Sequence, residues 1–180
     1  MDISGNIVDI VAQAIYPGTI TVQNGFITEL RREKSGVYDT YILPGFIDAH
    51  VHVESSMLPP SEFARMASVH GTIAAVCDPH EIANVLGPAG IRFMIDDAAR
   101  SPFKFYFAAP SCVPATPYET TGGYVGIQEI RLLLENSDIH LLGEVMNMPA
   151  VVNGERDITQ KIEAAKNAGK PIDGHAPGLS

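Results

Sequence analysis

Residues 44–52 read PGFIDAHVH, and the way this stretch folds decides how the rest of the chain is interpreted. The segment 46–53 is expected to form a strand. Successive side chains of a strand point to opposite faces, so His50 and His52 share one face while Val51 lies on the other. Two imidazoles on one face at a strand end can hold a metal ion. An HxH pair alone is equally compatible with two hydrogen-bonded polar side chains.

Downstream of Pro44, short apolar segments alternate with segments of helical pattern. Strands are expected at 46–53, 72–77, 103–109 and 139–144, with a last strand ending near residue 175. Helices are expected at 61–69, 81–86, 90–100, 127–136 and 158–168. Repeated βα units predict a parallel sheet. Polar residues fall at the strand ends, where parallel barrels carry their chemistry.

The chain is too short for a whole barrel of this type. A complete (β/α)8 barrel takes about 250 residues, and the residues after position 43 suffice for about five βα units. The predicted fold is therefore an incomplete, TIM-like (β/α)8 barrel over residues 44–180. Residues 1–43 are expected to form a small antiparallel β unit, part of a composite β-sandwich, with Asn24-Gly25 as a hairpin turn.

Composition excludes several classes of function. The 180 residues include 21 acidic and 12 basic side chains, a net charge of −9, and no basic run. A nucleic-acid partner is not expected, because binding phosphates requires clustered lysine and arginine. The sequence has no run of 18 apolar residues and no signal-peptide pattern at its start. A cytoplasmic protein without a membrane partner is therefore predicted.

A second polar cluster, Asp78-Pro79-His80-Glu81, follows the expected strand 72–77. Two carboxylates and an imidazole within four residues can bind a metal, hold a substrate or relay a proton. The alternative is a helix start, with Asp78 as the cap and Glu81 favoured by the helix dipole. Capping leaves His80 unexplained, so the functional interpretation is preferred. Asp48 shares the strand face of His50 and is expected to orient that ring.

The PGFIDAHVH segment resembles the first barrel strand of the amidohydrolase superfamily. This resemblance implies that His50 and His52 bind metal, that Glu144 in GEVMN bridges two metals, and that His175 in DGHAPG is a further ligand. A glutamate bridge argues against the hydantoinase-like and dihydroorotase-like members, which use a carboxylated lysine. The alternative for Glu144 is a surface carboxylate near a loop. The family's later histidine and aspartate ligands have no counterpart here.

Three more segments narrow the resemblance: ESSM at 54–57, DPHEIAN at 78–84 and PSCVPA at 110–115. Together with GEVMN and DGHAPG they are similar to the bacterial and archaeal adenine deaminases, over about residues 5–180. The resemblance implies hydrolysis of adenine to hypoxanthine and ammonia at a binuclear divalent metal centre. It favours manganese, with iron or zinc also compatible. The expected catalytic residues are Glu144, together with Asp78, His80 and Glu81 of the polar cluster after the strand 72–77.

Two rival interpretations remain open from the sequence. The protein is then either another amidohydrolase, acting on a cyclic amide, or a non-catalytic metal-binding fragment. The complete enzyme is expected to form a homo-oligomer, with adenine as its small-molecule partner. The isolated 180-residue chain is expected to be inactive, because it contains only part of the metal-ligand set and only part of the barrel.

Overall fold

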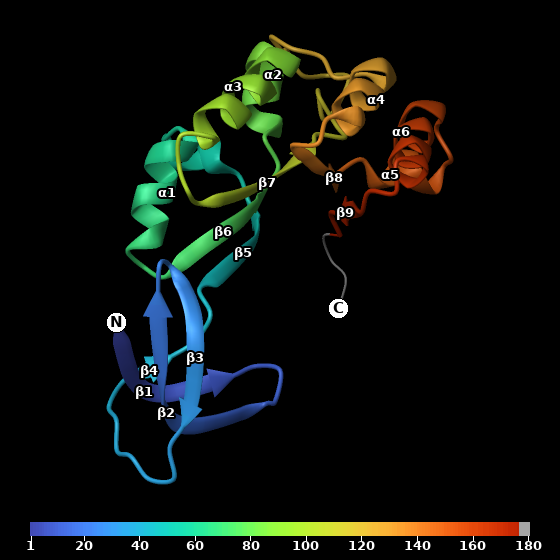
Figure 1. Cartoon of the computed structure of the whole chain (residues 1–180). Helices are drawn as coiled ribbons and strands as arrows, with labels where there is room; N and C mark the ends of the chain where they lie inside the picture. The colour runs from blue at the N-terminus through green and yellow to red at the C-terminus, as the bar shows by residue number, and fades with distance from the viewer. Residues whose placement is uncertain (177–180) are drawn as a thin grey trace. The chain divides into compact units, whose positions relative to one another are not determined.

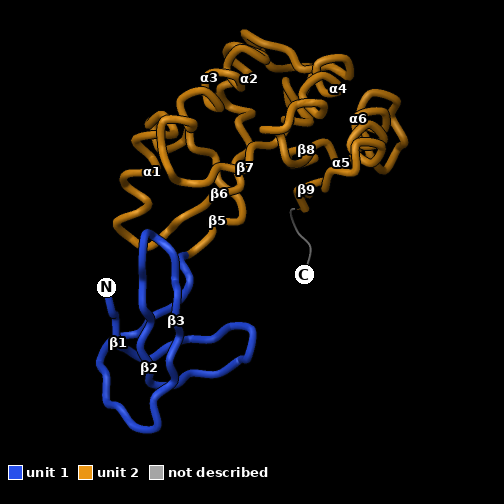
Figure 2. The backbone as a smooth tube through the Cα atoms, viewed as in Figure 1, with its two compact units in different colours: residues 1–45 blue, residues 46–180 orange. Residues whose placement is uncertain are grey.

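The computed structural model describes residues 1–176, which form parts of two compact units. One unit is Met1–Gly45 and the other begins at Phe46 (Figure 2). The Pro177 and Gly178 positions of the DGHAPG segment lie outside the described residues.

The first unit is a four-stranded sheet in the order β3-β2-β1-β4. Its strands are β1 (Asp2–Asp9), β2 (Ala14–Gln23), β3 (Phe26–Arg32) and β4 (Tyr41–Ile42). The first three pair antiparallel, and the two-residue β4 joins β1 in parallel. The predicted hairpin turn is confirmed, since Asn24 and Gly25 adopt φ of 53° and 80° between β2 and β3.

Strand β1 ends at Asp9, although apolar residues continue to Val11. Asp9 Oδ1 accepts hydrogen bonds from the backbone N–H groups of Val11 and Ala12 at 3.1 and 2.9 Å. An aspartate that bonds to its own following backbone forms a turn in place of a ladder.

The second unit contains a curled, all-parallel sheet in the order β5-β6-β7-β8-β9 (Figure 1). The strands are β5 (Phe46–Val51), β6 (Thr72–Cys77), β7 (Lys104–Ala109), β8 (Ile139–Val145) and β9 (Ile172–Gly174). Sequential strands are neighbours throughout, which is the topology of successive βα units. The predicted incomplete barrel is therefore confirmed as a half-barrel.

Helices connect the strands and lie along one side of this sheet (Figure 1). They are the 3-10 turn η1 (Val53–Ser56), α1 (Pro60–Ser68), α2 (His80–Leu86), α3 (Pro88–Ala98), α4 (Ile127–Glu135), α5 (Met148–Val152) and α6 (Arg156–Asn167). The short α5 was missed by the sequence analysis. It begins because the Asn147 side chain accepts a hydrogen bond from Ala150 N at 3.2 Å, with Pro149 in the first turn.

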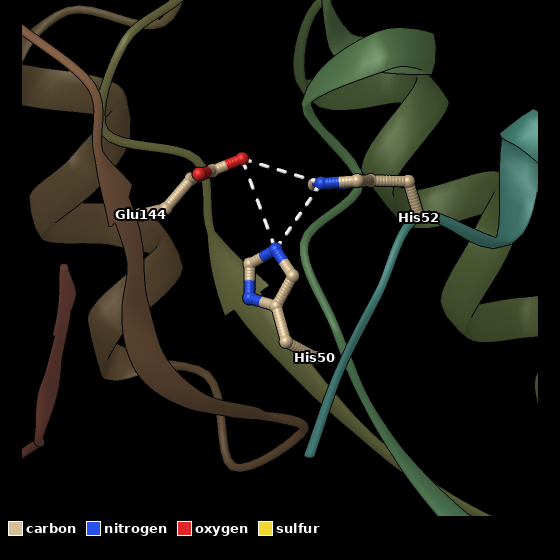
Figure 3. A group of neighbouring side chains, drawn as sticks. All are labelled: His50, His52 and Glu144. Atoms are coloured by element: carbon tan, nitrogen blue, oxygen red, sulfur yellow. Dashed lines mark hydrogen bonds and ion pairs between the residues drawn. The ribbon is translucent and has the colours of Figure 1, made fainter. Parts of the chain in front are cut away.

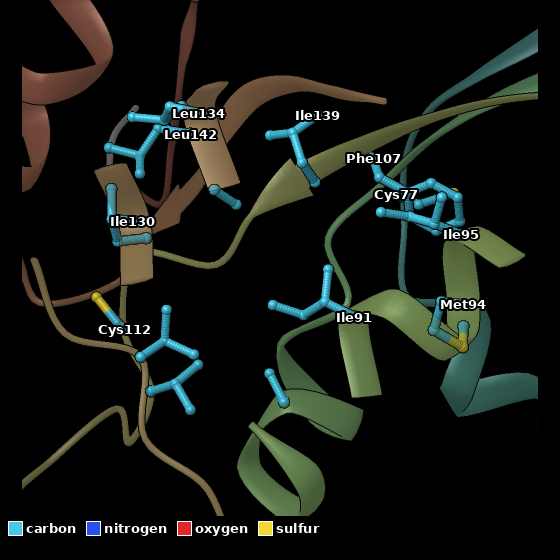
Figure 4. Close-up of a cluster of buried hydrophobic side chains, with 14 of the residues drawn as sticks. Cys77, Ile91, Met94, Ile95, Phe107, Cys112, Ile130, Leu134, Ile139 and Leu142 are labelled. Atoms are coloured by element: carbon cyan, nitrogen blue, oxygen red, sulfur yellow. The ribbon is translucent and has the colours of Figure 1, made fainter. Parts of the chain in front are cut away.

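Apolar side chains from the helices and strands of the second unit form its core (Figure 4). Ile91 on α3, Ile130 on α4, and Ile139 and Leu142 on β8 are 0–1% exposed. This packing fixes the neighbouring strands against their helices, so the residues at the strand ends are carried on a rigid base. None of the helices within residues 1–176 has the length and apolar character needed to cross a membrane.

Candidate metal centre

His50 and His52 meet at the carboxyl end of the first strand of the parallel sheet (Figure 3). The strand ends at Val51, one residue earlier than the alternation of side chains required, and His52 is the N-cap of the η1 turn. The two imidazoles nevertheless converge, with 3.2 Å between their Nε2 atoms. The shared orientation expected from the HxH spacing is therefore present.

Glu144, near the end of β8, closes this group from the other side (Figure 3). Its Oε1 lies 3.2 Å from His52 Nε2 and 3.8 Å from His50 Nε2. Its Oε2 lies 2.6 Å from His175 Nδ1. Only 6% of the residue is exposed, so it is not a surface carboxylate. The two oxygens of one carboxylate thus face two different sets of imidazoles.

Hydrogen bonds on the far sides of the rings fix which nitrogen carries the proton. His52 Nδ1 lies 2.9 Å from the carbonyl oxygen of Asp78, and His50 Nδ1 lies 2.8 Å from Asp173 Oδ2. Carbonyl and carboxylate oxygens only accept, so each Nδ1 must donate. In the neutral imidazoles the Nε2 atoms then present lone pairs.

Three acceptor atoms consequently point at one another: the Nε2 atoms of His50 and His52, and Oε1 of Glu144. Lone pairs held within 3.2–3.8 Å repel one another unless a cation or a proton lies between them. Imidazole nitrogen and carboxylate oxygen are ligands typical of first-row divalent metals. The residues present therefore fit a divalent metal ion.

A second group, Asp78, His80 and Glu144, adjoins the first. His80 Nδ1 lies 3.7 Å from both Asp78 Oδ2 and Glu144 Oε1. The ligand-type atoms of each three-residue group lie within 4.8 Å of one another. Among the described residues, Asp78 Oδ1 and His80 Nδ1 are buried without a hydrogen-bond partner. Such atoms mark a place where a ligand or a proton is expected.

Electrostatics in this group favour a charged His80. Burial lowers the pKa of its imidazole, but the contact with Asp78 and the charges of Asp78, Glu144 and Glu54 outweigh burial and raise it. A protonated imidazole among carboxylates can act as a proton donor.

The capping alternative for Asp78 is wrong. Helix α2 begins at His80, its N-cap is Pro79, and no side chain caps it. Asp78 is 3% exposed, and its Oδ2 accepts the backbone N–H of Glu144 at 2.8 Å. A Cβ on Gly143 would collide with this carboxylate, so a glycine is required for the approach.

Glu81 lies apart from the cluster around Glu144. Its Oε1 accepts the Ser55 hydroxyl at 2.6 Å, and the metal-type groups found within residues 1–176 do not include it. Nearby, Glu54 Oε1 accepts the backbone N–H of Ile82 at 3.2 Å. Burial is the largest cause of the raised pKa of Glu54, and the charge of Glu81 adds to it.

Comparison with known proteins assigns the chain to a family. Residues 41–180 match the model described as the amidohydrolase family. The chain belongs to the amidohydrolase family. It is 55% identical over 179 residues to the adenine deaminase of Sulfurovum sp. (strain NBC37-1), covering 99% of this chain and 33% of that relative.

Two further relatives are equally informative for this amidohydrolase. The adenine deaminase of Methanothermobacter thermautotrophicus is 54% identical over 178 residues, with 99% of this chain and 33% of the relative covered. That of Salinibacter ruber is 52% identical over 177 residues, with 98% and 32% covered. The chain therefore spans about a third of the length of the curated relatives it matches.

The amidohydrolase site also contains a residue that the sequence analysis missed. Asp173 holds the His50 ring, whereas Asp48, predicted to do so, accepts only the backbone N–H of His50 at 3.2 Å. The predicted role of Asp48 on the ring is therefore wrong. Asp173 precedes His175 by two residues in an expected strand, and this spacing predicts that the two side chains lie on the same face of the strand.

Proposed function

We propose that this chain supplies part of the active site of a metal-dependent adenine deaminase, which hydrolyses adenine to hypoxanthine and ammonia. The observation that carries the proposal is the convergence of His50 Nε2, His52 Nε2 and Glu144 Oε1 on one another within 3.2–3.8 Å. The substrate is inferred from the adenine deaminases that this chain resembles along 97–100% of its length. The activity is that of the full-length polypeptide containing residues 1–180.

The proposed ligands are His50, His52 and Glu144 for one divalent cation, and Glu144 with His175 for a second. Support comes from the two carboxylate oxygens of Glu144, which face these two sets of imidazoles separately. Manganese is the proposed metal, with iron or zinc compatible with the same ligands. When bound, a divalent cation lowers the pKa of water and so supplies a nucleophile near neutral pH.

Asp78 and His80 are the proposed proton carriers. In the overall reaction a C–O bond forms at C6 of adenine, the C6–N bond breaks, and the departing amine needs a proton to leave as ammonia. A carboxylate of Asp78 or Glu144 can take a proton from water. The His80 imidazole, whose pKa is raised, can deliver one to the leaving amine. A catalytic role for Glu81 remains a prediction.

The test is to purify the full-length polypeptide, load it with manganese, and measure ammonia release from adenine, with hydantoin and dihydroorotate as competing substrates. We expect turnover of adenine only, lost with a chelator and restored by manganese. Hydrolysis of the cyclic amides without adenine turnover would favour another amidohydrolase activity. Metal binding without any turnover would favour a non-catalytic protein.

Assembly and location remain predictions of the same proposal. A homo-oligomeric complete enzyme is expected, and light scattering of the full-length polypeptide measures it. A cytoplasmic location is expected, and fractionation of the source cells measures it.

A further inference from the structure

The backbone of Glu144 is held at both of its polar groups by buried side chains from the loops that follow β6 and β7. Its N–H donates to Asp78 Oδ2 at 2.8 Å, and its carbonyl accepts from Ser111 Oγ at 2.7 Å. Ser111 is 1% exposed. These two bonds fix the backbone position from which the Glu144 side chain extends toward the imidazoles.

Ser111 continues the sheet where the backbone ladder stops. The β7–β8 pairing ends with Ala109 opposite Leu142, two residues before Ser111 and Glu144 respectively. Beyond this pair, the Ser111 hydroxyl takes the place of a backbone donor to β8. The loop after β7 is thereby attached to the residue that carries the metal-facing carboxylate.

Lys161 on α6 in turn holds Ser111. Its Nζ donates to the carbonyl oxygen of Ser111 at 3.0 Å and pairs with Asp157 Oδ2 at 2.8 Å. The lysine is 3% exposed and occupies the buried stripe of α6 together with Ile158 and Ala165. A lysine is almost never fully buried unless it is paired, because taking its charge out of water is costly. An apolar side chain would fill this stripe without that cost.

We propose that Lys161 and Ser111 are positioning residues for Glu144: Lys161 fixes Ser111, and Ser111 fixes the carbonyl of Glu144. The proposal rests on the proposed function, in which Glu144 binds the metal. It explains why the charged Lys161 side chain is buried at a position where an apolar side chain would pack without the cost of desolvation. Groups that orient metal ligands in this way affect metal affinity by about 10- to 100-fold when removed.

The experiment compares Lys161→Met and Ser111→Ala in the full-length polypeptide, by titrating the metal-free protein with Mn²⁺ alone and by thermal melting. Methionine keeps the bulk of lysine and removes its charge. We expect Mn²⁺ affinity to fall about tenfold in both variants, while the melting temperature stays within about 4 °C of wild type. Ser111→Thr, which retains the hydroxyl, is expected to recover most of the affinity.

Two controls separate the possible outcomes. Ser68→Ala removes a comparable hydroxyl-to-carbonyl bond, from Ser68 Oγ to Ala64 O at 2.7 Å on α1, and is expected to leave Mn²⁺ affinity unchanged. Glu144→Gln tests the proposed function itself. If Glu144→Gln weakens Mn²⁺ binding while Lys161→Met and Ser111→Ala only lower the melting temperature, the positioning role is refuted and the metal site stands. If Glu144→Gln leaves Mn²⁺ binding intact, the proposed metal site fails, and the positioning role fails with it.

Discussion

Replacing Asp78 with asparagine changes a charge while almost preserving shape. Asp78 Oδ2 accepts the Glu144 N–H and lies 3.7 Å from His80 Nδ1, and Oδ1 is buried without a hydrogen-bond partner among the described residues. The amide oxygen of asparagine can still accept the Glu144 N–H. The variant therefore removes the negative charge and the capacity to take a proton, and little else.

The effects of Asp78→Asn on stability and on turnover can both be estimated. A hydrogen bond to a charged group contributes about 1.5–3 kcal/mol and a neutral one about 0.5–1.5 kcal/mol, so the weaker bond costs roughly 1 kcal/mol. Relief of a buried charge offsets part of this cost, and the melting temperature should change by no more than about 4 °C. Loss of a proton-transfer group, in contrast, reduces turnover by about 10²- to 10⁴-fold. Turnover and stability should thus respond very differently.

The assay is ammonia release from adenine by the manganese-loaded full-length polypeptide, with a thermal melt of the same preparation. Asp78→Ala is the companion variant: it leaves the buried Glu144 N–H without its acceptor, so it should lower both turnover and the melting temperature. Near-normal turnover of Asp78→Asn together with a large drop in melting temperature would refute the proton-transfer role and leave Asp78 a purely structural residue.

Three further outcomes are expected. Burial raises the pKa of Glu54, so the native state binds this proton more tightly than the unfolded chain does, and the wild type loses stability as the pH rises above the ordinary value of 4.5. Glu54→Gln can still accept the Ile82 N–H but cannot ionise, so its free energy of unfolding in urea titrations should increase relative to wild type from pH 4 to pH 7. The same difference between variant and wild type at both pH values would contradict this. Burial raises the pKa of Cys77 to about 12, so this thiol should react with a disulfide reagent only after unfolding; rapid labelling of the native protein would argue otherwise. Asp173→Ala should weaken Mn²⁺ binding about tenfold. Asp173→Asn can still accept a hydrogen bond from His50 and should weaken Mn²⁺ binding less. Equal losses of affinity in the two variants would show that the carboxylate charge matters and the orientation of the His50 ring does not.

The sequence predicted the parallel sheet well because its signals are local. Strand β6 runs over 72–77 as expected, since an apolar run there is bounded by Gly71 and Asp78. The half-barrel followed from the regular spacing of such runs. Boundaries were less predictable where a side chain decides them, as with the turn that Asp9 makes at the end of β1.

The candidate metal ligands were partly predictable. The spacing of His50 and His52 within residues 44–52 predicts a shared strand face, whereas Glu144 and His175 were identified through the resemblance to the amidohydrolase superfamily. The spacing of Asp173 and His175 predicts a shared strand face, but the contacts made by the groups that hold these ligands were not predictable, because the partners are distant. Asp173 lies 123 residues from His50, and Lys161 lies 50 residues from Ser111. Such contacts depend on how the sheet curls, and no local pattern records them.

The claim that the imidazoles and Glu144 hold a metal is tested most directly by locating the metal. Crystals of the manganese-loaded full-length polypeptide, measured at the manganese absorption edge, give an anomalous difference map. We expect a peak within roughly 2.0–2.2 Å of His50 Nε2, His52 Nε2 and an oxygen of Glu144. A fully loaded crystal with its manganese elsewhere, and no peak among these three residues, would contradict it.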